Sequence, residues 1–115
     1  FELPGVFAPC CSFSLASAAD RIGREKGLSI RGGMLFSGAA FHYTDSYLRR
    51  WAEAGALAVE METAALYMNA MTAGREALTI CTITDMVFTG ERCSPQERQT
   101  SLDAMLSLAL DTAIQ

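Results

Sequence analysis

Two glutamates that flank a methionine are the first candidates for chemistry in this sequence. The short apolar run Ala58-Val59 ends in Glu60-Met61-Glu62. If the run is a strand, both carboxylates lie at its carboxyl end, where open α/β sheets bind ligands. In the alternative, both are solvated residues in the first turn of the next helix, where negative charge suits the helix dipole. The residue types alone leave both interpretations open.

Asp85 is a further acidic candidate because it directly follows the apolar and β-branched run at residues 78–84. A carboxylate at the end of a buried strand is partly desolvated, and a desolvated carboxyl group is suited to act as a general acid. The alternative is that Asp85 caps a turn with Met86 and Val87.

Arg98 occupies an electrostatically unfavourable position. It follows Glu97 in the first turn of a predicted helix, where the dipole disfavours a cation by about 0.3–1 kcal/mol. An anionic partner elsewhere in the fold would explain it. A solvent-exposed pair with Glu97 or Glu91 would explain it equally well.

Phe41 and His42 lie in a predicted loop. Phe41 can offer a flat face to a planar ligand, or it can tuck back into the core. His42 is the only histidine, and without an identifiable partner we expect it at the surface.

The composition predicts a globular protein and excludes several classes. The chain has 115 residues, 50% hydrophobic residues and a net charge of -4, which gives no basic face for nucleic acid. No apolar run approaches the roughly 20 residues that span a bilayer, so we expect no membrane segment and a cytoplasmic location. The four cysteines have no CxxC spacing, so we expect reduced thiols, with Cys81 in the core, and no metal site. Because the chain begins at Phe1 rather than at methionine, we expect a fragment.

Hydrophobic periodicity predicts a single α/β unit over residues 1–115, with a largely parallel or mixed sheet flanked by helices. We expect helices at residues 12–26, 44–54, 63–73 and from 95 onward, and strands at residues 28–36, 56–59 and 78–84. Gly32-Gly33 predicts a bulge or a close backbone approach in the first strand. Helical spacing predicts one inward face for three of these helices. In the first helix the inward residues are Leu15, Ala18, Ala19 and Ile22, and in the third they are Ala64, Tyr67, Met68 and Met71. In the last helix they are Leu102, Met105, Leu106, Ala109, Leu110 and Ala113.

Four segments together are more specific than any single residue. They are Phe36-Ser37 through Phe41, Val59-Glu60-Met61-Glu62, Leu78-Thr79-Ile80-Cys81-Thr82-Ile83-Thr84-Asp85 and Glu97-Arg98-Gln99-Thr100. In order and spacing they resemble the carboxyl-terminal half of the bacterial-type, hexameric purine nucleoside phosphorylases.

The resemblance implies phosphate-dependent cleavage of purine nucleosides to free base and pentose 1-phosphate, with no cofactor and no metal. It also implies a homo-oligomer, in that family a hexamer. By position, Glu62 would bind the ribose hydroxyls and Met61 would pack on the sugar. Val59 and Glu60 would line the base pocket, and Phe41 would stack near the base.

The same resemblance implies that Asp85 donates a proton to the purine N7 and that Arg98 assists. Thr84 stands at a substrate-binding position where the family usually has serine, and His42 replaces what is often tyrosine. The family's phosphate-binding residues belong to its amino-terminal half, which has no matching segment in this sequence. Two alternatives therefore stay open, a purine nucleosidase that uses water, such as a methylthioadenosine nucleosidase, and a non-catalytic nucleoside-binding or assembly fragment.

Overall fold

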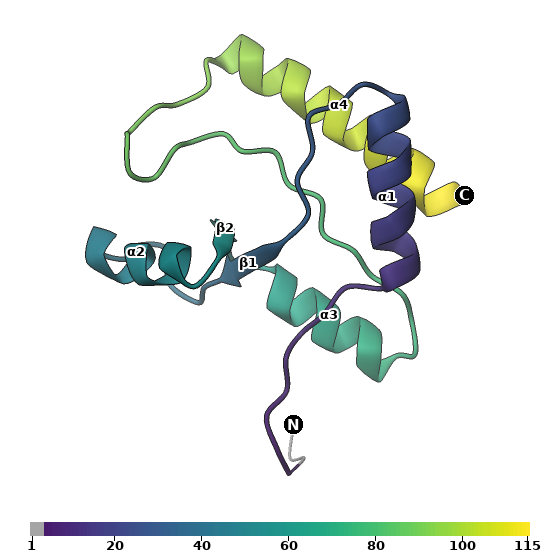
Figure 1. Ribbon diagram of the computed structural model, residues 1–115, viewed down its shortest axis with the longest axis horizontal. Helices are drawn as coiled ribbons and strands as arrows, with labels where there is room; N and C mark the ends of the chain where they lie inside the picture. Colours follow the sequence, from purple (N-terminus) through teal and green to yellow (C-terminus); the bar gives the residue numbers. More distant parts are fainter. Residues whose placement is uncertain (1–3) are drawn as a thin grey trace.

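Two short strands, β1 (Met34–Ser37) and β2 (Ala56–Glu60), pair in parallel at the centre of the computed structural model. The structure describes residues 4–115. The helices are α1 (Phe13–Glu25), α2 (Asp45–Glu53), α3 (Thr63–Thr72) and α4 (Pro95–Ile114). Figure 1 shows α1 and α4 side by side, with α2 and the strands in a separate group. The predicted α/β class with parallel pairing is confirmed.

The strand pairing contains an irregularity close to, but not at, the two glycines where a bulge was predicted. Met34 pairs with Ala56 and Leu35 with Ala58, so the register shifts between them. Next to this shift, Gly33 lies against the Leu57 side chain, and a Cβ atom on Gly33 would be 2.6 Å from Leu57 Cδ1. The predicted close backbone approach is replaced by a close approach of the Leu57 side chain to Gly33.

Local capping features stabilise several of the helix ends. Ser94 Oγ accepts from the Glu97 backbone N–H, and Glu97 Oε2 accepts from the Ser94 backbone N–H, which completes a capping box at α4. Thr44 Oγ1 accepts from the Tyr47 backbone N–H at the start of α2. Gly74 follows α3 with a φ of 63°, a conformation that favours glycine.

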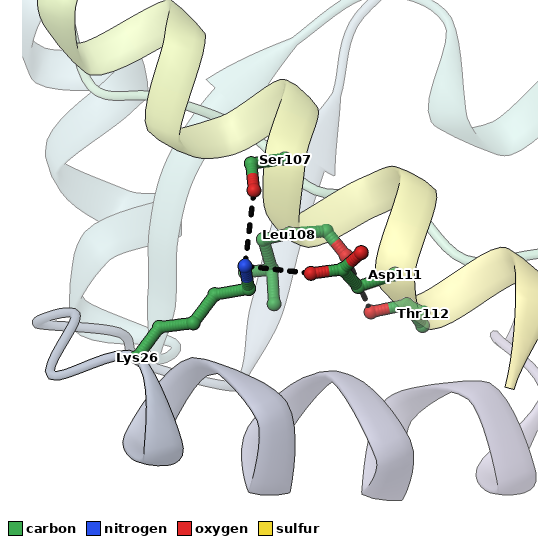
Figure 2. A network of polar contacts seen from close by, with 5 residues as sticks. All are labelled: Lys26, Ser107, Leu108, Asp111 and Thr112. Carbon is green, nitrogen blue, oxygen red and sulfur yellow. Dashed lines mark hydrogen bonds and ion pairs between the residues drawn. The ribbon is translucent and has the colours of Figure 1, made fainter.

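The small core lies mainly between α1 and α4. Ala18, Ala19 and Ile22 of α1 are buried, as predicted, and so is Leu108 of α4. Beside them, Lys26 Nζ lies 2.6 Å from Asp111 Oδ2 and 3.0 Å from Ser107 Oγ (Figure 2). This polar network fixes the carboxyl end of α1 to the second half of α4.

An aromatic cluster joins β1 to α2. Phe36 is buried, and its ring stacks on Trp51 with a centroid distance of 4.6 Å. Tyr43 and Tyr47 meet Phe36 edge-on at 5.2 Å and 5.9 Å. The cluster holds α2 against the sheet.

The prediction of a strand at residues 78–84 was wrong. This apolar run crosses the molecule without joining the sheet, as the green segment of Figure 1 shows. Strand structure needs a partner for its backbone groups, and within residues 4–115 β1 and β2 pair only with each other. The predicted strand at residues 28–36 is likewise reduced to Met34–Ser37.

Several predicted core positions are exposed, because the molecule is flat, measuring 46 × 40 × 21 Å. Leu106 and Leu110 on α4 are 54% and 65% exposed, whereas Leu108 is 3% exposed, so the buried face of α4 differs from the predicted one. Ala113, Met71 and Cys81 are exposed as well. In the part of the chain that the structure describes, no helix is both long and apolar enough to cross a membrane.

Candidate functional site

A cleft of about 450 Å³ opens at the carboxyl end of the sheet. Three separate segments form it, namely the connection from β1 to α2 together with the first turn of α2, the junction of β2 with α3, and the turn that follows the apolar run. Its lining residues are Ala40, Phe41, His42, Tyr43, Asp45, Leu48, Val59, Glu60, Met61, Glu62, Asp85 and Val87. Six of the eight predicted site residues therefore share one cleft.

Glu60 is turned toward the start of α3. Its Oε2 atom accepts hydrogen bonds of 2.7 Å from the backbone N–H groups of both Glu62 and Thr63. Burial by itself would raise the pKa of Glu60, but these hydrogen bonds, with the neighbouring Ser37 and Thr63 hydroxyls, outweigh it and lower the pKa. Glu60 therefore stabilises the helix start with one oxygen while it lines the cleft.

The second oxygen of Glu60, Oε1, is buried and has no partner of hydrogen-bonding geometry within residues 4–115. The Ser37 Oγ atom next to it accepts from the Ala64 backbone N–H at 3.0 Å. β1, β2 and α3 thus meet at this carboxylate, which explains why an acidic side chain is tolerated at the end of the strand.

Glu62 and Met61 face the cleft with fewer contacts. Glu62 is the N-cap residue of α3, but its side chain makes no capping hydrogen bond. Met61 and Val59 are both partly exposed beside it. The site therefore offers a carboxylate that makes no hydrogen bond to the start of its own helix, next to apolar side chains, a combination suited to a ligand with hydroxyl groups and an apolar ring face.

Phe41 projects from the turn between β1 and α2 and is 80% exposed. Its ring meets His42 edge-on, with a centroid distance of 4.6 Å. Both rings line the cleft, so His42 belongs to the site's surroundings, a position that its isolation in the sequence did not indicate. An exposed aromatic ring at a cleft is a surface on which a planar group can stack.

Asp85 begins a small antiparallel turn rather than ending a strand. It forms an isolated bridge with Arg92, and the Cys93 N–H donates to the Thr84 carbonyl at 2.8 Å. The guanidinium of Arg49 on α2 lies 4.3 Å from the Phe88 ring centroid. This contact ties the turn to α2 and helps to place Asp85 at the cleft.

Thr84 and Arg98 do not line the cleft. Arg98 lies in the first turn of α4, where its backbone N–H donates to the Ser94 carbonyl at 2.9 Å. Within residues 4–115, no group of three or more His, Cys, Asp or Glu side chains is arranged to hold a metal ion.

Five lining residues were not identified from the sequence, namely Ala40, Tyr43, Asp45, Leu48 and Val87. The first four lie just before or within the first turn of α2, and only their closeness to Phe41 in the sequence could have indicated them. Cys81 lies near the two glutamates of the cleft. The pKa of its thiol is raised, mainly by desolvation and to a smaller extent by the negative charges of Glu60 and Glu62.

The sequence profile of the phosphorylase superfamily matches residues 2–112. The chain belongs to this superfamily. Among similar proteins are DeoD-type purine nucleoside phosphorylases of Anoxybacillus flavithermus at 43% identity, Geobacillus sp. strain WCH70 at 44% and Listeria welshimeri at 45%. Each comparison covers 108 residues, which is 94% of this chain and 46% of the relative.

The resemblance to bacterial purine nucleoside phosphorylases is therefore confirmed along nearly the whole chain. The chain spans about half the length of the curated relatives that it matches. As a member of the superfamily, it carries a cleft at the carboxyl end of its parallel strands, where α/β proteins bind ligands.

Proposed function

We propose that this chain forms the nucleoside-binding wall of a purine nucleoside phosphorylase. The observation that supports this most directly is the cleft itself. It brings Phe41, Met61, Glu62 and Asp85 together from three segments that lie far apart in the sequence. An aromatic face, an apolar patch and two carboxylates match the chemistry of a purine joined to a sugar.

In the proposed reaction, inorganic phosphate is the co-substrate, and no metal or organic cofactor takes part. A phosphate oxygen forms a bond to the anomeric carbon of the sugar. The bond from that carbon to the purine nitrogen breaks, and its electron pair goes to the base. The products are the free purine and the pentose 1-phosphate.

Each cleft residue has a proposed role in this step. Glu62 accepts hydrogen bonds from the ribose hydroxyls, and its charge stabilises the sugar as positive charge develops on it. Asp85 donates a proton to the purine N7, because a purine is a poor leaving group as an anion. Phe41 stacks on the base, while Val59 and Met61 pack beside the base and the sugar.

The remaining predictions concern residues and properties outside the cleft. Arg98 would assist Asp85, and Thr84 would contribute a hydroxyl near the base. A homo-oligomer, with a hexamer implied by the family resemblance, and a cytoplasmic location also remain predictions from the sequence.

Binding of inosine by titration calorimetry is the first test. Glu62→Ala should weaken binding about 10- to 100-fold, the usual effect of removing a charged hydrogen-bond acceptor. Glu53→Ala is the matched control, because Glu53 is an exposed glutamate of α2 outside the cleft. Absence of binding by the unsubstituted chain, or equal effects of the two variants, would overturn the proposal.

Release of hypoxanthine from inosine, measured with and without phosphate, separates the possible reactions. Phosphate-dependent release supports a phosphorylase, and equal rates without phosphate support a nucleosidase. Binding without release in either buffer supports a non-catalytic nucleoside-binding fragment. Wherever release is observed, Asp85→Asn should lower its rate about 10²- to 10⁴-fold, and an unchanged rate would rule out the acid role.

A further inference from the structure

The turn that carries Phe41 is tied to one side chain, Tyr43. The Tyr43 hydroxyl oxygen accepts a hydrogen bond from the Ala40 backbone N–H at 2.9 Å. This bond spans the turn and closes residues 40–43 into a small loop, with Phe41 and His42 at its tip. The loop has no helix or strand of its own to fix its shape.

Tyr43 also fills the space beside Gly38. A Cβ atom on Gly38 would lie 2.7 Å from the Tyr43 hydroxyl oxygen and 2.8 Å from its Cε2 atom. Gly38 in turn is anchored to the sheet, since its N–H donates to the Glu60 carbonyl at 2.8 Å. The absence of a side chain at residue 38 therefore allows the tyrosine ring to approach the end of β1.

The Tyr43 ring is itself held by the scaffold. It stacks on Tyr47 of α2 with a centroid distance of 5.1 Å and an interplanar angle of 10°. On another side it meets the buried Phe36 of β1 edge-on at 5.2 Å. The ring thus connects the turn to both β1 and α2.

Phe41, by contrast, has little support of its own. It is 80% exposed, and in the described part of the chain its aromatic contact is with His42, a residue of the same turn. An exposed side chain on an irregular loop loses conformational freedom when it binds a ligand, and this lowers affinity. Any contact that fixes the loop beforehand reduces that loss.

We propose that Tyr43 is a positioning residue, which orders the turn so that Phe41 is ready to stack on the purine. This inference rests on the proposed nucleoside-binding function. The Tyr43 hydroxyl contributes to affinity through Phe41 rather than through contact with the reacting atoms.

Tyr43→Phe tests the inference because it removes the hydroxyl and keeps the ring. We expect inosine binding to weaken about 3- to 10-fold, the usual effect of losing one neutral hydrogen bond. Tyr47→Phe is the matched control, since the Tyr47 ring stacks on Tyr43 but its hydroxyl makes no hydrogen bond within residues 4–115. The control should bind inosine as the unsubstituted chain does.

A double-mutant cycle separates positioning from a general structural effect. If Tyr43 acts through Phe41, then Tyr43→Phe should cause no further loss of affinity in a Phe41→Ala background. A purely structural role would lower affinity equally in both backgrounds. That result, or full affinity of Tyr43→Phe itself, would overturn the inference.

Amide hydrogen exchange provides a readout that needs no ligand. Exchange at the Ala40 N–H should be faster in Tyr43→Phe and unchanged in Tyr47→Phe, and an unchanged rate in both would contradict the role of the hydroxyl. Failure of the unsubstituted chain to bind inosine would overturn the proposed function, and the positioning role with it. Binding that is insensitive to Tyr43→Phe would overturn this inference alone.

Discussion

Glu60 offers the sharpest test of how the cleft is held together. We expect Glu60→Gln to destabilise the chain, because the glutamate oxygen accepts two backbone N–H groups at 2.7 Å each at the start of α3. Glutamine keeps the shape and an acceptor oxygen but removes the charge. A hydrogen bond to a charged group contributes about 1 kcal/mol more than a neutral one, and the helix dipole adds about 0.3–1 kcal/mol.

For two such bonds and the dipole, the expected loss of unfolding free energy is at most about 3 kcal/mol. Solvent screening of this partly exposed group reduces the loss to about 1–2 kcal/mol. Urea unfolding followed by circular dichroism at pH 7 should therefore show a midpoint lower by about 0.5–1 M. Glu62→Gln is the control, because the Glu62 side chain makes no capping hydrogen bond. Equal midpoints for the two variants would refute the reasoning.

The pH dependence of this effect has a definite sign. The pKa of Glu60 in the folded chain is lowered from an ordinary value of 4.5, so the unfolded chain binds the proton more tightly. The stabilisation by Glu60 is therefore fully present above the unfolded pKa and is lost as the pH falls through the folded pKa. The difference between the unsubstituted chain and Glu60→Gln should shrink on acidification, and a difference that grows below pH 4.5 would contradict this sign.

Three further predictions follow from the packing and the electrostatics. Leu108→Ala should lower the free energy of unfolding by about 2–5 kcal/mol, whereas Leu110→Ala, on the exposed face of α4, should change it by less than about 0.5 kcal/mol in urea unfolding. Lys26→Met should lower the free energy of unfolding by about 0.5–1 kcal/mol, because it removes the ion pair with Asp111. If the ion pair is the cause, this difference should disappear in 1 M salt. Cys81 should react with iodoacetamide at pH 8 more slowly than a free thiol of ordinary pKa, because its thiolate is disfavoured, and an equal rate would contradict the raised pKa.

Local signals in the sequence were sufficient for the helices. The spacing of apolar residues repeats within a few residues, so it predicted α1, α2, α3 and α4 closely, and Thr44 and Ser94 cap α2 and α4 as such residues usually do. The short strand β2 was also predicted from its apolar run, and here β1 supplies the partner that a strand needs. The helix signals alone need no knowledge of distant parts of the chain.

Features that depend on partners could not be predicted in the same way. The run at residues 78–84 has the composition of a buried strand, but a strand forms only where a neighbour supplies backbone hydrogen bonds. Likewise, the apolar spacing of α4 did not show that Leu108 would face α1 while Leu106 and Leu110 would face outward. Periodicity identifies an apolar face, whereas packing decides which part of it is buried.

The candidate site shows the same division between local and distant information. The motif around Met61 and the carboxylate of Asp85 were identified as separate candidates, and the cleft brings them together. The contribution of Tyr43 was missed, because a tyrosine beside a predicted helix start has no distinctive pattern. Its importance depends on a hydrogen bond to Ala40 and on rings from β1 and α2.

The turn that bears Asp85 has a kinetic consequence. The turn is held by the Asp85–Arg92 bridge, by three backbone hydrogen bonds and by the stacking of Arg49 on Phe88. Residues 85–92 are all exposed. Segments with few buried contacts open at a lower free-energy cost than the rest of a fold. The turn should therefore open more often than the paired strands β1 and β2, and each opening would move Asp85 while the sheet stays intact. Amide exchange at the Cys93 N–H, which bonds to the Thr84 carbonyl, would then be faster than exchange within the β1–β2 pairing.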